Sequence, residues 1–177
     1  MKLYILRHEE RDINNPLFFS PLTSAGIQNS IHLVNKLESI NIDSVYTSPF
    51  LRVLQTIYPY CKKHNVFVNV DNSLYESMDD SQFNSINKNN KWKDLPNKYK
   101  QIINSEYISM YGNVKLYETF EEVCERVIPF IQFLKKQNKN ILIVTHQTIC
   151  NAILNHFDKN INDDTPFKMG EYKEIII

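Results

Sequence analysis

The 177-residue sequence has few cysteines and no excess of either charge. Cys61, Cys124 and Cys150 are scattered and form no CxxC pair, which argues against a disulfide framework or a structural zinc site and favours a reducing compartment. Lysine plus arginine and aspartate plus glutamate both number 20. This balance argues against nonspecific binding to nucleic acid or a membrane surface, but it does not exclude a local basic pocket.

Long hydrophobic runs are also missing. The apolar run at the N-terminus is too short for a signal peptide and is broken by Arg7, and no stretch is long enough to span a bilayer. We therefore expect a cytoplasmic protein. Its 42% hydrophobic and 23% charged residues are ordinary for a globular chain, and its length suits one domain that buries roughly 70% of the surface of the unfolded chain.

Apolar strand patterns alternate with amphipathic helix patterns along the chain. This order predicts an α/β fold, a three-layer α/β/α sandwich around a mostly parallel sheet. Residues from about 72 to 116 show no clear periodicity except a short helix, and we interpret them as an insertion over the active site within a single domain of residues 1–177. The predicted strands are 3–6, 45–46, 66–70, 141–144 and 171–177, and the predicted helices are 24–40, 49–63, 96–104, 120–137 and 149–157.

Candidate polar residues lie at or soon after the ends of three predicted strands. Arg7 and His8 end the first strand, Arg52 follows the second, and His146 follows the strand at 141–144. The carboxyl ends of parallel strands share one edge of a sheet, where α/β folds place their ligands. Two guanidinium groups and two imidazoles around one small volume suit a phosphoryl group, because guanidinium forks match phosphate oxygens. One imidazole can attack phosphorus to give a phosphohistidine, and the second can hydrogen-bond the developing charge.

The segment after the second strand predicts a helix start. Ser48 suits the N-cap and Pro49 suits the first helical position. Arg52 then lies about one turn inside a helix whose N-terminus faces the same edge of the sheet. Free backbone amides and the positive end of the helix dipole favour an anion there.

Six segments carry recognisable patterns, in order over nearly the whole chain. They read Leu-Arg-His-Glu-Glu at 6–10, Pro-Leu-Thr-Ser-Ala-Gly-Ile-Gln at 21–28, Tyr-Thr-Ser-Pro-Phe-Leu-Arg-Val-Leu-Gln-Thr at 46–56, Leu-Tyr-Glu at 74–76, Glu-Thr-Phe to Arg-Val at 118–127, and Ile-Val-Thr-His at 143–146. Together they resemble the histidine phosphatase superfamily, also called phosphoglycerate mutase-like. Its motifs include Arg-His-Gly-Glu, Leu-Thr-x-x-Gly-x-x-Gln and Ser-Ser-Pro-x-x-Arg-x-x-x-Thr. The combination is specific, although any one motif alone is weak.

The resemblance implies a role for each matching residue. His8 would be the phosphorylated nucleophile, and Glu76 would protonate the leaving oxygen and then help to activate water. From the residues alone, Asp79 or Asp80 remains an alternative acid. No metal and no cofactor is implied. The remaining implied contacts to phosphate or substrate come from Arg7, Asn14, Thr23, Arg52, His146 and Gln147.

Two positions depart from the family pattern. Where the family usually has glycine after each histidine, this chain has Glu9 and Gln147, and it contains only three glycines in total. A Glu9 carboxylate that pointed into the pocket would oppose phosphate, whereas one that pointed out would leave only its backbone amide there. Gln147 would narrow the leaving-group side of the pocket.

The sequence therefore predicts a metal-independent phosphoric monoester hydrolase of the histidine acid/alkaline phosphatase type, acting through a phosphohistidine on His8. Its expected partner is a small phosphorylated substrate, with a phosphoprotein as the second class, and neither nucleic acid nor a membrane. Two alternatives stay open, a phosphoglycerate-type phosphomutase and a catalytically impaired homologue that binds a phosphate ligand or a protein. Substrate identity and oligomeric state are not predicted, because fold and site residues are shared across substrates.

Overall fold

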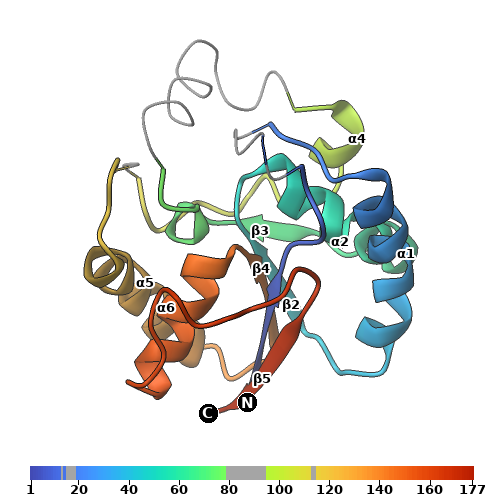
Figure 1. Ribbon diagram of the computed structural model, residues 1–177. Helices are drawn as coiled ribbons and strands as arrows, with labels where there is room; N and C mark the ends of the chain where they lie inside the picture. The colour runs from blue at the N-terminus through green and yellow to red at the C-terminus, as the bar shows by residue number, and fades with distance from the viewer. Residues whose placement is uncertain (13, 15–18, 79–94, 113–114) are drawn as a thin grey trace.

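A computed structural model of the protein describes residues 1–12, 14, 19–78, 95–112 and 115–177 (Figure 1). Its centre is a five-stranded sheet in the order β3-β2-β4-β1-β5. β1 pairs with β4, β4 with β2, and β2 with β3, all in parallel, and only β5 runs antiparallel, on the edge beside β1. The strands are β1 (Lys2–Arg7), β2 (Ser44–Thr47), β3 (Val68–Val70), β4 (Ile141–Thr145) and β5 (Tyr172–Ile176).

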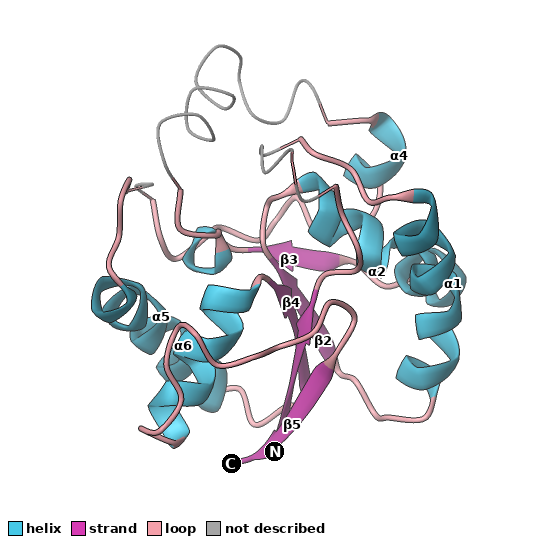
Figure 2. Ribbon diagram, viewed as in Figure 1, coloured by secondary structure: helices cyan, strands magenta, loops and turns pink. Residues whose placement is uncertain are grey.

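Helices cover both faces of this sheet (Figure 2). α1 (Ser24–Glu38) and α2 (Leu51–His64) pack together on one face, and α5 (Phe120–Lys135) and α6 (Gln147–Phe157) pack together on the other. The short α4 (Asn97–Lys100) lies against α2, and a 3-10 turn, η1 (Asn72–Leu74), contacts α5. The predicted three-layer fold with a mostly parallel sheet is confirmed.

The central strands divide the core into two layers because successive side chains of a strand point to opposite faces. Tyr4 and Leu6 of β1 belong to the cluster with α1 and α2, whereas Leu3 and Ile5 belong to the cluster with α5 and α6. β4 divides its side chains in the same way. Both central strands are buried on both faces, which explains why they read as continuous apolar runs in the sequence.

Several predicted boundaries were wrong by a few residues. β3 begins at Val68 rather than at residue 66, and α6 begins at Gln147 rather than at residue 149. The helix expected over 96–104 is only α4, because residues 102–104 pair with the edge strand instead. The Val68 N–H donates to the Ile102 carbonyl (2.7 Å), and the Asn104 N–H donates to the Val68 carbonyl (2.9 Å).

The interpretation of residues 72–116 as an insertion within a single domain stays a prediction. Asp79 and Asp80, the alternative acids, lie outside the described residues. None of the helices in the described ranges combines the length and the apolar character needed to cross a membrane.

Candidate active site

The carboxyl ends of the three central strands bring His8, His146 and the segment before α2 to one edge of the sheet. The hydrogen bonding of the parallel strands continues one residue beyond them, since the His8 N–H donates to the Thr145 carbonyl (2.9 Å) and the Ser48 N–H donates to the Val144 carbonyl (3.0 Å). His146 follows β4 directly and precedes α6. The backbone therefore fixes both histidines at one edge of the sheet.

His8 is buried, with 3% of its surface exposed. Its Nδ1 lies 2.7 Å from the Glu9 carbonyl oxygen, which can only accept, so Nδ1 carries the proton. A neutral His8 then keeps its lone pair on Nε2, where Arg52 Nε donates at 3.3 Å. Burial, followed by the positive charge of Arg52, holds the pKa of His8 well below its usual range. At neutral pH His8 therefore offers an unprotonated ring nitrogen.

His146 is fully buried, and its ring centroid lies 5.2 Å from that of His8. Its Nε2 lies 2.8 Å from Ser48 Oγ. A Ser48 hydroxyl that donates to Nε2 leaves the proton of a neutral His146 on Nδ1. This Nδ1 is buried and has no hydrogen-bond partner among the residues that the structure describes. Burial and then Arg52 lower the pKa of His146 well below its usual range, so the imidazole is neutral here too.

The Ser48–His146 contact corrects the expected start of α2. Ser48 does not cap this helix; the N-cap is Phe50, without a side-chain cap bond, and α2 begins at Leu51. Arg52 is accordingly the second helical residue. The Phe50 ring packs against the His146 ring (centroids 4.7 Å apart) and under the Arg52 guanidinium (4.5 Å).

The two arginines bring positive charge to the two neutral imidazoles. Arg52 is 2% exposed, and burial lowers its pKa to about 9, so it remains a cation at neutral pH. Arg7 is half-buried, and its Nη1 donates to Gln147 Oε1 (2.6 Å) and to the Phe167 carbonyl. Gln147, where the family usually has glycine, therefore orients Arg7. An anion is the ligand that this charge favours.

Glu76 lies shortly after η1, and its carboxyl group interacts electrostatically with both Arg7 and Arg52. Burial raises the pKa of its carboxyl, and the nearby Arg52 charge acts in the opposite direction. The Ser77 N–H donates to Glu76 Oε1 (3.1 Å). A carboxyl group with a raised pKa beside an anion site is suited to donate a proton.

Asn14 and Thr23 are placed differently. Thr23 is the N-cap of α1, where it accepts from the Gly26 N–H (3.0 Å) and donates to Glu10 Oε1 (2.7 Å). Asn14 lies in an exposed turn, and its backbone N–H donates to Asp12 Oδ1 (2.9 Å). The substrate contacts expected of these two residues stay predictions.

The Glu9 carboxylate lies outside the cluster of histidines and arginines. It packs against Gly170 and lines a pocket of about 320 Å³ with Asn29, His32 and Lys36, and neither His8 nor His146 lines that pocket. Only the backbone of Glu9 takes part in the site, through its carbonyl to His8 and its N–H, which donates to Thr56 Oγ1 (2.9 Å).

Gly170 packs closely against the Glu9 carboxylate and has a positive φ. A Cβ added to Gly170 would lie 2.2 Å from Glu9 Oε1, and Gly170 has φ +70°, which favours glycine. We expect Gly170→Ala to lower the free energy of unfolding by about 1–3 kcal/mol. Urea denaturation measures the loss, with Gly112→Ala as the matched control because a Cβ there has no atom of the described residues within 4 Å. Equal stability of the two variants would contradict the prediction.

Comparison with known proteins places the chain in a family. The model of the histidine phosphatase superfamily (branch 1) matches residues 3–171. The chain belongs to this superfamily.

Individual relatives are distant. A 2,3-bisphosphoglycerate-dependent phosphoglycerate mutase of Methanosarcina acetivorans is 22% identical, with 92% of this chain and 84% of the relative covered. A 6-phosphofructo-2-kinase/fructose-2,6-bisphosphatase of Mus musculus is 25% identical over 93% of this chain, which spans only 34% of that relative. A solved structure, described as a putative alpha-ribazole-5'-P phosphatase of Escherichia coli, has a TM-score of 0.70 at 21% identity, covering 100% of this chain and 91% of that one.

Proposed function

We propose that the protein is a phosphomonoester hydrolase that works without a metal ion, through a phosphohistidine on His8. One observation carries this proposal. A buried, neutral histidine holds its Nδ1 proton against the Glu9 carbonyl and presents Nε2 beside Arg52, next to a second neutral histidine. A lone pair among fixed cations is the arrangement that nucleophilic attack on a phosphate requires.

The first half-reaction transfers the phosphoryl group to the enzyme. His8 Nε2 attacks phosphorus in line, so that a P–N bond forms while the P–O bond to the leaving group breaks. Arg7 and Arg52 hold the transferred oxygens, and the Nδ1–H of His146 donates to one of them as negative charge develops. Glu76 gives its proton to the leaving oxygen, which departs as an alcohol.

The second half-reaction returns the enzyme to its starting state. Glu76, now a carboxylate, accepts a proton from water as the water oxygen attacks the phosphoryl group. The P–N bond breaks, His8 regains its lone pair, and inorganic phosphate leaves. Electrostatic positioning by the arginines and His146 supplies most of the catalysis, as is general for phosphoryl transfer.

A small phosphomonoester is the proposed substrate class. The relatives are named for phosphoglycerate, a fructose bisphosphate and a ribazole phosphate, which are all small phosphorylated molecules. The placement of Glu9 weighs against the impaired-homologue alternative, because its carboxylate packs against Gly170 rather than beside the proposed nucleophile.

A phosphomutase is the second candidate, favoured by the Methanosarcina relative that is named as a phosphoglycerate mutase. The two functions differ in the fate of the phosphoenzyme. A hydrolase passes the group to water, whereas a mutase keeps it until a second substrate molecule takes it.

Hydrolysis of p-nitrophenyl phosphate in the presence of EDTA tests the proposal. We expect turnover that EDTA does not reduce, with inorganic phosphate and p-nitrophenol released in equal amounts. A parallel incubation with 3-phosphoglycerate separates the two candidates. Release of phosphate in either incubation supports the hydrolase, whereas conversion to 2-phosphoglycerate without phosphate release supports the mutase. Turnover that EDTA abolishes would exclude a metal-free mechanism.

A further inference from the structure

A buried ion pair on the α5 side of the sheet takes no direct part in the proposed phosphoryl transfer. Arg126 donates through Nε and Nη2 to the two carboxylate oxygens of Glu118, both at 2.8 Å. The side chains are only 2% and 1% exposed. Burying two charges requires that both lose their hydration, so such a pair is weak evidence for stability and calls for another explanation.

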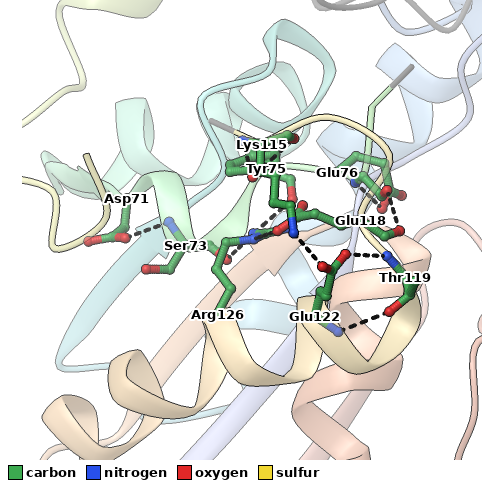
Figure 3. A network of polar contacts seen from close by, with 10 residues as sticks. Asp71, Ser73, Tyr75, Glu76, Lys115, Glu118, Thr119, Glu122 and Arg126 are labelled. Atoms are coloured by element: carbon green, nitrogen blue, oxygen red, sulfur yellow. Dashed lines mark hydrogen bonds and ion pairs between the residues drawn. The ribbon is translucent and has the colours of Figure 1, made fainter. Parts of the chain in front are cut away.

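The third nitrogen of the guanidinium contacts the segment that ends in Glu76. Arg126 Nη1 donates to the carbonyls of Ser73 (2.7 Å) and Tyr75 (3.2 Å), and the guanidinium carbon lies 3.8 Å from the centre of the Tyr75 ring. Figure 3 shows the Arg126 side chain reaching from α5 to the loop that carries Tyr75 and Glu76. The Tyr75 carbonyl belongs to the peptide bond between Tyr75 and Glu76. By binding this carbonyl, Arg126 fixes the orientation of the peptide plane that precedes the Cα of Glu76.

Other contacts fix the same segment. The carbonyl between the two held by Arg126, that of Leu74, accepts from Thr145 Oγ1 at 2.8 Å. Ser77 Oγ donates to the Glu118 carbonyl at 3.3 Å. Three successive carbonyls before Glu76 are thus bound by side chains from α5 and from the end of β4, and the residue after Glu76 is bound to Glu118.

We infer that Arg126, held by Glu118, is a positioning residue for Glu76, the proposed proton donor, an inference that rests on the proposed function. The ion pair orients the guanidinium so that its remaining nitrogen sets the backbone of residues 73–75, and this backbone aims the Glu76 carboxyl at the leaving oxygen. A misplacement of about 1 Å at a catalytic group can cost roughly 100-fold in rate.

A series of ring-substituted phenyl phosphates tests this inference, because their size is nearly constant while the basicity of the leaving oxygen varies. A proton donor matters most for the most basic leaving groups and little for the least basic. In the wild type, kcat/KM should depend weakly on leaving-group basicity, and Glu76→Gln should make the dependence steep, with a loss of roughly 10²–10⁴ for the poorest leaving group.

Arg126→Lys keeps a positive charge beside Glu118. Its ammonium group lacks the planar guanidinium that binds Glu118 and the carbonyls of Ser73 and Tyr75 at the same time. Arg126→Lys should steepen the same dependence, with a loss of roughly 10- to 100-fold for phenyl phosphate and little loss for the most activated substrate. The double variant Arg126→Met/Glu118→Gln leaves no buried unpaired charge and should behave likewise. Glu122→Gln is the matched control, because it removes the charge that pairs with Lys115 at the exposed start of α5, while the glutamine oxygen can still accept from the Thr119 N–H.

The possible outcomes distinguish a positioning role of Arg126 from a structural role, and both from failure of the proposed function. An equal loss for all substrates in both Arg126 variants would mean a structural role alone and would overturn the inference. A steep dependence in Glu76→Gln together with an unchanged one in the Arg126 variants would overturn the inference but keep the proposed function. No hydrolysis by the wild type would overturn the hydrolase itself, and the inference with it.

Discussion

Replacing His8 with glutamine is expected to remove phosphatase turnover, by roughly 10⁴-fold or more, which is the scale of losing a nucleophile. Glutamine is close in size and retains a hydrogen-bond donor for the Glu9 carbonyl, but its amide nitrogen has no lone pair that can attack phosphorus. Steady-state hydrolysis of p-nitrophenyl phosphate measures the loss. His32→Gln is the control, because His32 is exposed and lies on α1. A His8→Gln enzyme with wild-type turnover would falsify the phosphohistidine mechanism.

The buried histidines also predict how the free energy of unfolding of the wild type varies with pH. The pKa of His8 in the folded protein lies below 6.5, its usual value. As the pH falls below 6.5, the unfolded chain therefore binds a proton that the folded protein excludes, so this contribution to stability is present above pH 6.5 and is lost in acid. His8→Gln should flatten the fall in the free energy of unfolding between pH 6.5 and the lowered pKa, measured by urea denaturation at each pH.

The sequence was most informative where burial decides the structure. β1 and β4 are buried on both faces, so their apolar runs and abrupt polar ends indicated His8 and His146 as candidate site residues without a structure. The helix start at Ser48 and Pro49, after the second strand, then indicated Arg52. The central strands pair in parallel, so their carboxyl ends lie at one edge of the sheet and the residues that follow them form one cluster. This clustering follows from the topology of the sheet and not from any single residue.

Residues whose partners are distant in sequence were missed. Ser48 has the N-cap preference that local statistics recognise, but a contact with His146, 98 positions away, determines its role. Arg126 matched a family segment, yet nothing local indicates that it binds the carbonyls of Ser73 and Tyr75. Glu9 was left as two alternatives, because its carboxylate packs against Gly170, which is far away in the sequence.

Arg52 should affect both the rate and the pH dependence of the enzyme. Its guanidinium is buried and donates to His8 Nε2. Its charge, after burial, lowers the pKa values of His8 and His146, and it opposes the rise that burial causes in the pKa of Glu76. Removal of one preorganised donor typically costs roughly 10²–10³ in rate. We expect a loss of this size in kcat/KM for both Arg52→Gln and Arg52→Lys, because neither side chain reproduces the planar fork.

The pH profiles should distinguish the two Arg52 variants. Activity needs a neutral His8 and a protonated Glu76, so kcat/KM falls in acid through the pKa of His8 and in base through that of Glu76. The Arg52 charge lowers both pKa values. Its loss in Arg52→Gln should therefore move both limbs to higher pH, whereas Arg52→Lys keeps the charge and should leave the limbs in place. All variants are assayed with one substrate, so the ionisation of that substrate affects every profile equally. Lys62→Gln serves as the control for loss of a charge elsewhere on α2. Unmoved limbs in Arg52→Gln would show that Arg52 does not set the protonation of His8 and Glu76.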